Sequence, residues 1–184
     1  MEVYDKNKIG KLVSWGSDHF VYNYGSDQVI KFSIIDFLLG KEGEKKVLHD
    51  YAVCEYFFGM YLLPTTIMRS PSGKRIAKVQ QKIVGRPLTK ADLARPKVRQ
   101  QFLEIIDRYY AMITAGYAEL DLTGQGGFFS RCLSNVFISP EDKLIILDAM
   151  LLEIKASTFL TPLVPTIRKI ALHRQHFLIK NFLN

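Results

Sequence analysis

The chain has 184 residues, of which 48% are hydrophobic and 12% aromatic, a size and composition typical of one globular domain. No apolar run approaches the roughly 20 residues that cross a bilayer, and the N-terminus lacks the basic start and apolar core of a signal peptide, so we expect a cytoplasmic protein without a membrane partner. The net charge is +7, and the two cysteines, Cys54 and Cys132, lack the CxxC spacing of a zinc site.

The first half of the chain predicts mainly strands. β-Branched and aromatic runs bounded by Gly, Ser and Asp predict three short strands, at 11–15, 20–24 and 28–32. An apolar residue at each of positions 47, 51, 54 and 58 predicts a helix over 43–59. A hairpin is predicted for 65–69 and 75–84, and Gly85-Arg86-Pro87 has the composition of a linker.

The second half predicts mainly helices. A long helix is expected near 97–117, followed by a Gly-rich stretch at 124–127. Two short strands are expected at 135–138 and 144–147, and a last helix at about 164–182. This order of strands and helices is typical of an α+β fold.

Three motifs follow one another at a characteristic spacing. They are the turn Trp15-Gly16-Ser17-Asp18, the strand Val29-Ile30-Lys31, and Asn135 placed thirteen positions before Asp148. Together they resemble the protein-kinase-like superfamily, especially its aminoglycoside-phosphotransferase-like and small bacterial branches. The resemblance covers roughly residues 11–150. It implies a bilobal fold, with a small antiparallel sheet and one helix in an N-lobe over 1–86, and a truncated, mainly helical C-lobe over 87–184.

The resemblance also implies ATP and Mg²⁺ as cofactors. Gly16 and Ser17 would cover the phosphates, although the other glycines of the kinase loop are missing. Lys31 would bind the phosphates and pair with an acidic residue of the next helix. Asp50 is the first choice for that partner because of its separation from Lys31, and Glu55 is the second.

The catalytic loop departs from the family pattern. Asn135 and Asp148 would hold Mg²⁺ through hard oxygen ligands. Five positions before Asn135, where kinases have their catalytic aspartate, the chain has Ser130, which cannot serve as a general base at neutral pH without a base of its own. Asp121 precedes the Gly-rich stretch, which could fold this carboxylate back toward the site; otherwise it caps the end of the long helix.

Three functions fit this pattern. The first is a kinase-like nucleotide-binding protein whose phosphotransfer is atypical, weak or absent. The second is an active small-molecule or protein phosphotransferase that uses Asp121 as a relocated catalytic carboxylate, with an acceptor that the sequence does not identify. The third is a non-catalytic basic adaptor. No acidic residue follows Glu153, so the C-terminal helix could bind nucleic acid or a protein, although a solvated basic face is the favoured interpretation.

Overall fold

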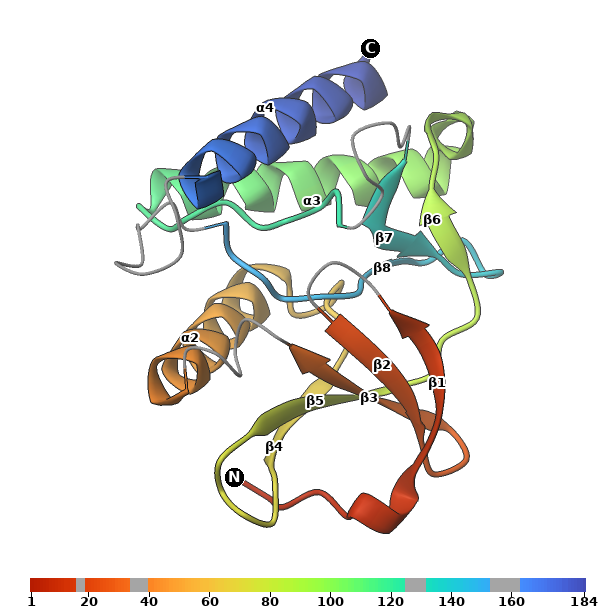
Figure 1. The fold of residues 1–184 in the computed structure, drawn as a ribbon. Helices are drawn as coiled ribbons and strands as arrows, with labels where there is room; N and C mark the ends of the chain where they lie inside the picture. Colours follow the sequence, from red (N-terminus) through yellow and green to blue (C-terminus); the bar gives the residue numbers. More distant parts are fainter. Residues whose placement is uncertain (16–18, 34–39, 125–131, 153–162) are drawn as a thin grey trace. The chain divides into compact units, whose positions relative to one another are not determined.

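The structure is a computed structural model that describes residues 1–15, 19–33, 40–124, 132–152 and 163–184. It contains two compact units (Figure 1). The first unit consists of Met1–Ala52 and Leu63–Ile83, and the second of Val53–Leu62 and Val84–Asn184. We expected one boundary after residue 86, whereas residues 53–62 belong to the second unit.

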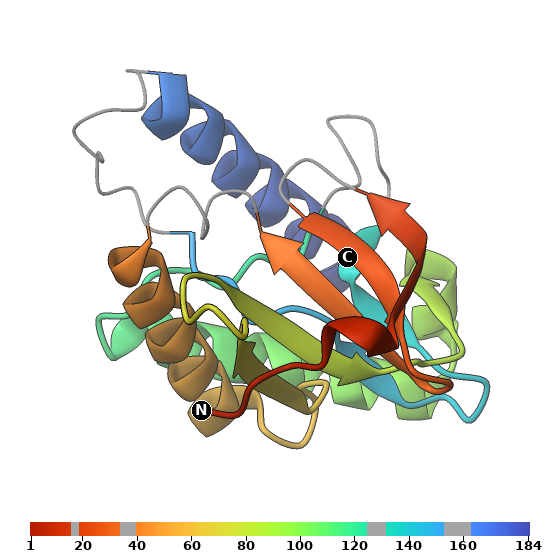
Figure 2. The ribbon, with the colours of Figure 1, turned by 60° about the horizontal axis from the view of Figure 1, so that its bottom comes forward.

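A five-stranded antiparallel sheet forms most of the first unit. Its strands are β1 (Ile9–Trp15), β2 (His19–Tyr24), β3 (Gln28–Ser33), β4 (Thr65–Arg69) and β5 (Ile76–Gln81), in the order β1-β2-β3-β5-β4. A 3₁₀ turn, η1 (Lys6–Lys8), precedes β1. Figure 2 shows the N-terminal segment passing along the sheet, where Val3 forms a parallel bridge with Arg69. The predicted strands of this half are confirmed to within three residues at each end.

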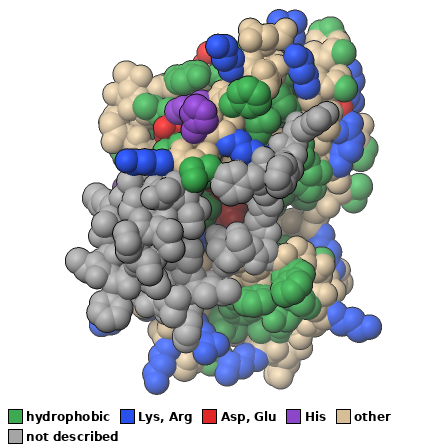
Figure 3. Space-filling model, turned by 45° about the horizontal axis from the view of Figure 1, so that its top comes forward, with side chains coloured by type: hydrophobic (Ala, Val, Ile, Leu, Met, Phe, Trp, Pro, Cys, Tyr) green, Lys and Arg blue, Asp and Glu red, His purple; other side chains and the backbone are tan. Residues whose placement is uncertain are grey.

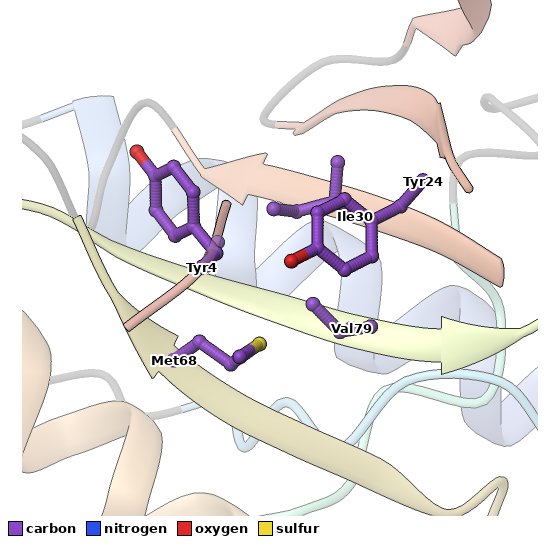
Figure 4. Close-up of a cluster of buried hydrophobic side chains, with 6 residues drawn as sticks. Tyr4, Tyr24, Ile30, Met68 and Val79 are labelled. Atoms are coloured by element: carbon purple, nitrogen blue, oxygen red, sulfur yellow. The ribbon is translucent and has the colours of Figure 1, made fainter. Parts of the chain in front are cut away.

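One face of this sheet carries an apolar core. Figure 4 shows that Tyr4, Tyr24, Ile30, Met68 and Val79 gather there from four strands and the N-terminal segment. Ile30 is fully buried, and burial of a side chain of this size contributes about 1.5–3 kcal/mol. Ile30 lies opposite Val79 across the β3–β5 pair, so the register of these two strands is fixed by the core.

Helix α2 (Lys41–Phe58) follows the sheet's first three strands and crosses from the first unit into the second after Ala52. Tyr51 accepts a hydrogen bond at its hydroxyl from Thr65 N (3.1 Å), and Glu44 pairs with Arg69, so both contacts join α2 to β4. The helix ends at Phe58, directly before Gly59, as the sequence predicts.

The second unit combines helices with a small sheet. Its elements are β6 (Arg86–Leu88), the 3₁₀ helix η2 (Lys90–Ala94), α3 (Pro96–Thr114), β7 (Leu133–Ile138), β8 (Leu144–Ile146) and α4 (Leu163–Leu183). The sheet order is β6-β7-β8, so the residues expected to form a linker, 85–87, partly form an edge strand. Pro87 fits there because an edge strand tolerates a residue without an N–H group.

Helices α3 and α4 lie side by side in this unit (Figures 1 and 2), with the rings of Phe102 and Phe182 5.6 Å apart. The buried positions of α3 include Val98, Phe102, Ile105 and Tyr109, which recur with helical spacing on one apolar face. Proline at the first position of α3 suits a helix start, where the missing N–H has no intrahelical acceptor. Among the described residues, no helix is long and apolar enough to cross a membrane.

Candidate functional site

The candidate site lies in the second unit, around an extended segment at 119–124. Asp121 N donates to Met150 O (2.9 Å), and Leu152 N donates to Glu119 O (2.7 Å), so this segment runs beside 150–152. Asn135 N donates to Leu122 O (3.2 Å), which joins the segment to β7 as well. Two later stretches of the chain, β7 and 150–152, therefore flank Asp121.

The side chain of Asp121 is buried and organises a tight turn. Its Oδ1 accepts three hydrogen bonds, from Thr123 N (3.0 Å), Thr123 Oγ1 (2.9 Å) and Gly124 N (2.9 Å). Every hydrogen bond to this carboxylate from the described residues ends on Oδ1. The turn therefore fixes the carboxylate in one orientation. Helix α3 ends at Thr114, so Asp121 caps this turn and not the helix.

Asn135 is held directly against Asp121. Its Nδ2 donates to the main-chain oxygen of Asp121 (2.8 Å), which orients the amide group. Gly124 has a φ of +55°, and a Cβ at this position would lie 2.5 Å from Asn135 Oδ1. Glycine is needed here both for its positive φ and for the room that it leaves at the amide oxygen.

Asp148 completes a group of three polar side chains. Leu147 N donates to Asn135 O (2.9 Å), so Asp148 follows directly after a main-chain contact with Asn135. Burial raises the pKa of Asp121, the hydrogen bonds at Oδ1 lower it, and the negative charge of Asp148 raises it further. The two carboxylates are thus close enough to interact, and both are buried.

The chemistry of these side chains fits a hard divalent cation. The Asn135 amide nitrogen is engaged by Asp121, so its oxygen is the atom that can bind a cation, and Gly124 leaves that oxygen room. Asp148 supplies a carboxylate, as Mg²⁺ prefers. In the described ranges there is no group of three or more His, Cys, Asp or Glu side chains that could bind a metal. A Mg²⁺ ion here would therefore need further ligands from phosphate or water.

The other predicted site residues fall in different places. Ser130, Gly16 and Ser17 lie outside the described residues. Lys31 is in β3, opposite Val21 of β2 and Lys78 of β5, on the face of the sheet away from the Ile30 core.

The two acidic residues that could pair with Lys31 differ in burial. Asp50 is 3% exposed and pairs with Lys46, whose Nζ lies 2.6 Å from Asp50 Oδ2. Glu55 is exposed and belongs to the second unit. A buried carboxylate requires cationic partners more than an exposed one does, so burial favours Asp50. Its pairing with Lys31 remains a prediction.

Some of the described basic residues of α4 form an exposed row. Lys169, His173 and Lys180 are exposed and, separated by four and seven residues, lie on one side of the helix, with the exposed apolar residues Ile170 and Phe177 beside them. Figure 3 shows Lys and Arg side chains dispersed among apolar ones on the face that it draws. The solvated-face interpretation of the basic C-terminal helix stays a prediction.

The contribution of α4 to the site was not predicted from the sequence. Gln175 is fully buried and hydrogen-bonds the main chain on both sides of Asp121. A single glutamine in a basic helix carries no sequence signal for such a role. Thr123 was also missed, although Asp-Leu-Thr-Gly has the Asp and Gly positions of a type I turn, and Gly124 was expected only as part of the Gly-rich stretch.

Comparison with known proteins supports the fold. The chain is similar to the solved structure of the Legionella pneumophila Lpg2603 kinase bound to IP6, with a TM-score of 0.51 and 15% sequence identity. The match covers 94% of this chain and 58% of that kinase, so the chain spans little more than half of the kinase's length. No family model matches the chain, and neither does any curated protein. The likeness shows a kinase-like α+β fold, in agreement with the resemblance found in the sequence motifs.

Proposed function

We propose that this chain binds ATP with Mg²⁺ and transfers a phosphoryl group, with Asp121 as the catalytic carboxylate. The observation that carries the proposal is the hydrogen bond from Asn135 Nδ2 to the main-chain oxygen of Asp121, because it holds the predicted metal ligand beside the residue whose carboxylate interacts with Asp148. Ser130 then does not need to act as a base, and its position in the loop becomes irrelevant to proton transfer.

Each residue has a distinct role in this proposal. Lys31, with Asp50 as its partner, binds the phosphates, and Asn135 and Asp148 hold the Mg²⁺ ion, which supplies positive charge against the phosphate oxygens. Asp121 orients the acceptor hydroxyl at Oδ2 and takes its proton as the oxygen attacks the γ-phosphorus. The bond to the β,γ-bridging oxygen breaks, and ADP leaves with that oxygen. The acceptor is a hydroxyl group of a small molecule or a protein.

Nucleotide binding is tested by thermal denaturation with ATP, with and without Mg²⁺. A ligand at 100 times its dissociation constant stabilises the folded state by about 2.7 kcal/mol. We expect a clear shift for the wild type with ATP and Mg²⁺, and a much smaller one for Lys31→Ala and Asp148→Ala. An absence of any shift for the wild type at millimolar ATP would refute the proposal.

The catalytic role is tested by a matched pair of variants, Asp121→Asn and Ser130→Ala. Phosphate release from ATP is the assay, with water as the acceptor. A general base contributes about 10²–10⁴-fold, so Asp121→Asn should lower turnover by at least the smaller factor while ATP still stabilises the protein. Ser130→Ala should leave turnover unchanged.

The same assay identifies the competing function. If ATP stabilises the wild type but neither wild type nor variants release phosphate above background, the chain is a nucleotide-binding protein without transfer activity. The departures that favour this outcome are the missing loop glycines and Ser130.

A further inference from the structure

We infer that Gln175 of α4 is a positioning residue that holds the Asp121 segment in its reactive orientation, an inference that rests on the proposed function. Gln175 is the one fully buried polar residue among the described residues of α4. Its amide makes hydrogen bonds at both ends. Oε1 accepts from Leu122 N (2.7 Å), and Nε2 donates to Leu120 O (2.9 Å).

These two bonds take the place of a neighbouring strand. The N–H and C=O of Asp121 point to one edge of the extended segment, where Met150 O and Asn135 Nδ2 bind them. The C=O of Leu120 and the N–H of Leu122 point to the other edge, because successive peptide groups alternate in an extended chain. The Gln175 amide binds both groups there, so Asp121 is fixed from both sides.

The glutamine is itself fixed by α3. Its Nε2 also donates to the Tyr109 hydroxyl (3.1 Å), and that hydroxyl donates to Glu119 at the start of the same segment. His176, the next residue of α4, lies with Nε2 2.7 Å from Glu119 Oε2. These four side chains therefore form one connected network, and Glu119, its member in the segment, lies two residues before Asp121.

Loss of the amide should therefore reduce catalysis more than nucleotide binding. Gln175→Met keeps the length and bulk of the side chain but leaves Leu122 N–H and Leu120 C=O without partners. A displacement of about 1 Å in a catalytic group can lower the rate by about 10²-fold. The predicted phosphate ligands Lys31 and Asp50 belong to the first unit, whereas Gln175 and its hydrogen-bond partners belong to the second, so the KM for ATP should not change with kcat.

The chain provides a matched control in Gln101 of α3. Its Oε1 accepts from Leu144 N (3.0 Å), and its Nε2 donates to Asp142 O (2.7 Å), so it binds the β7–β8 turn in the same manner. Gln101→Met thus removes an equivalent pair of bonds from the same unit without touching the Asp121 segment.

The test compares ATP hydrolysis, in the presence of Mg²⁺, by the two variants of the full chain. We expect Gln175→Met to lower kcat by about 10–100-fold with KM for ATP within twofold of wild type, and Gln101→Met to leave kcat within twofold. An equal loss of kcat in both variants would reflect a general loss of stability. No loss in either variant would show that the Gln175 amide does not position Asp121. Either result would overturn the inference.

A second measurement does not depend on turnover. The amide hydrogens of Thr123 and Gly124 donate to Asp121 Oδ1, so their exchange with solvent, followed by NMR, reports on the Asp121 turn. We expect faster exchange of both amides in Gln175→Met and unchanged exchange in Gln101→Met. If the wild type has no turnover, the proposed function fails while this exchange still decides the positioning role. Unchanged exchange of both amides in Gln175→Met would then refute it.

Discussion

In the proposed function, burial and the opposing hydrogen bonds at Asp121 together set the pH range in which it can act as a base. The carboxyl must be ionised to accept a proton, and burial holds its pKa above the ordinary value. As the pH is lowered, activity should therefore begin to fall at a higher pH than it would if the carboxyl were exposed and had its ordinary pKa. The Thr123 hydroxyl opposes this rise because it donates to the ionised form.

Thr123→Val should raise the pKa of Asp121 further, since it removes that donor while keeping the shape of the side chain. We expect the acid limb of the kcat profile to move to higher pH, with the plateau little changed. The control is Thr89→Val, which removes the same kind of bond, from Thr89 Oγ1 to Asp92 (2.8 Å), at a distant site. A shift in both variants, or a shift to lower pH, would contradict the assignment.

At Gly124, the close approach to Asn135 can be tested separately from the backbone strain. Gly124→Ala introduces both a strained positive φ and a Cβ against Asn135 Oδ1, whereas Gly116→Ala, with a φ of +87°, introduces only the strain. The strain alone costs about 1–2 kcal/mol per residue. Denaturant unfolding should show a larger loss for Gly124→Ala, and only this variant should weaken stabilisation by ATP with Mg²⁺. Equal losses and equal ATP responses would show that the approach to Asn135 is unimportant.

Counting along the chain could not have found the pairing of Asp121 with Asn135. The family pattern places the aspartate five positions before the asparagine, which leads to Ser130, whereas Asp121 lies fourteen positions before it. Hydrogen bonds that join 119–124 to both β7 and 150–152 bring the two residues together. These are tertiary contacts that neither periodicity nor spacing encodes.

At the scale of elements, local patterns were sufficient for most helices and strands. Helices α2, α3 and α4 lie within three residues of their predicted ends because their apolar positions repeat with helical periodicity. Strand β6 was missed since Gly85-Arg86-Pro87 has a loop composition and its pairing partner, β7, is about fifty residues away in sequence. Gln175 was missed for the same reason, since its partners lie in another element.

The contact of β6, η2 and α3 depends on one buried carboxylate, Asp92. Arg86 donates two hydrogen bonds to it, Arg95 and Thr89 donate others, and Arg95 also pairs with Asp142. The hydrogen bonds from Arg86 lead the effects that hold the pKa of Asp92 well below its ordinary value. The carboxylate therefore stabilises the folded state at neutral pH.

Asp92→Asn should destabilise the protein at pH 7 by about 1–3 kcal/mol, the range for hydrogen bonds to charged groups, and nearer the lower end because both arginines are partly exposed. A lowered folded pKa means that this stabilisation is present above the unfolded pKa, about 4, and is lost as the pH falls below it. The difference between wild type and variant in denaturant unfolding should thus shrink between pH 5 and pH 3. A constant difference, or one that grows, would contradict the ionic role of Asp92. Asp142→Asn, at a more exposed member of the network, should have the smaller effect.

At the scale of the molecule, the order of elements together with three short motifs was enough to predict a kinase-like α+β fold, whereas the bilobal arrangement stays a prediction. The chain is similar in fold to a solved kinase at 15% identity, and a small sheet, a helix and a β-hairpin follow one another along it in the expected order. The chain matches 58% of that kinase, so the activity of the whole kinase does not transfer to it with the fold. Function is less constrained, since a fold hosts activities that individual side chains decide.

The net charge of +7 raises the question of nucleic acid as a ligand of the whole molecule. The exposed basic residues of α4, Lys169, His173 and Lys180, form only a short row beside exposed Ile170 and Phe177, and two lysines neutralise few phosphates, so we expect only weak, non-specific binding. Fluorescence anisotropy with a labelled 20-base-pair DNA should give dissociation constants no tighter than about 10⁻⁵ M near physiological salt.

That weak binding should weaken further with salt, whereas stabilisation by ATP with Mg²⁺ should persist. Each phosphate that a lysine no longer neutralises reduces the steepness of log affinity against log salt by about 0.9 for duplex DNA. The double variant Lys169→Ala/Lys180→Ala should therefore change this slope by no more than about two, and the Lys6→Ala/Lys8→Ala pair, at exposed positions of the first unit, is its control. Sub-micromolar binding at physiological salt that only the α4 variant abolishes would favour the adaptor function, and an ATP response retained in that variant would show that the two ligands use separate surfaces.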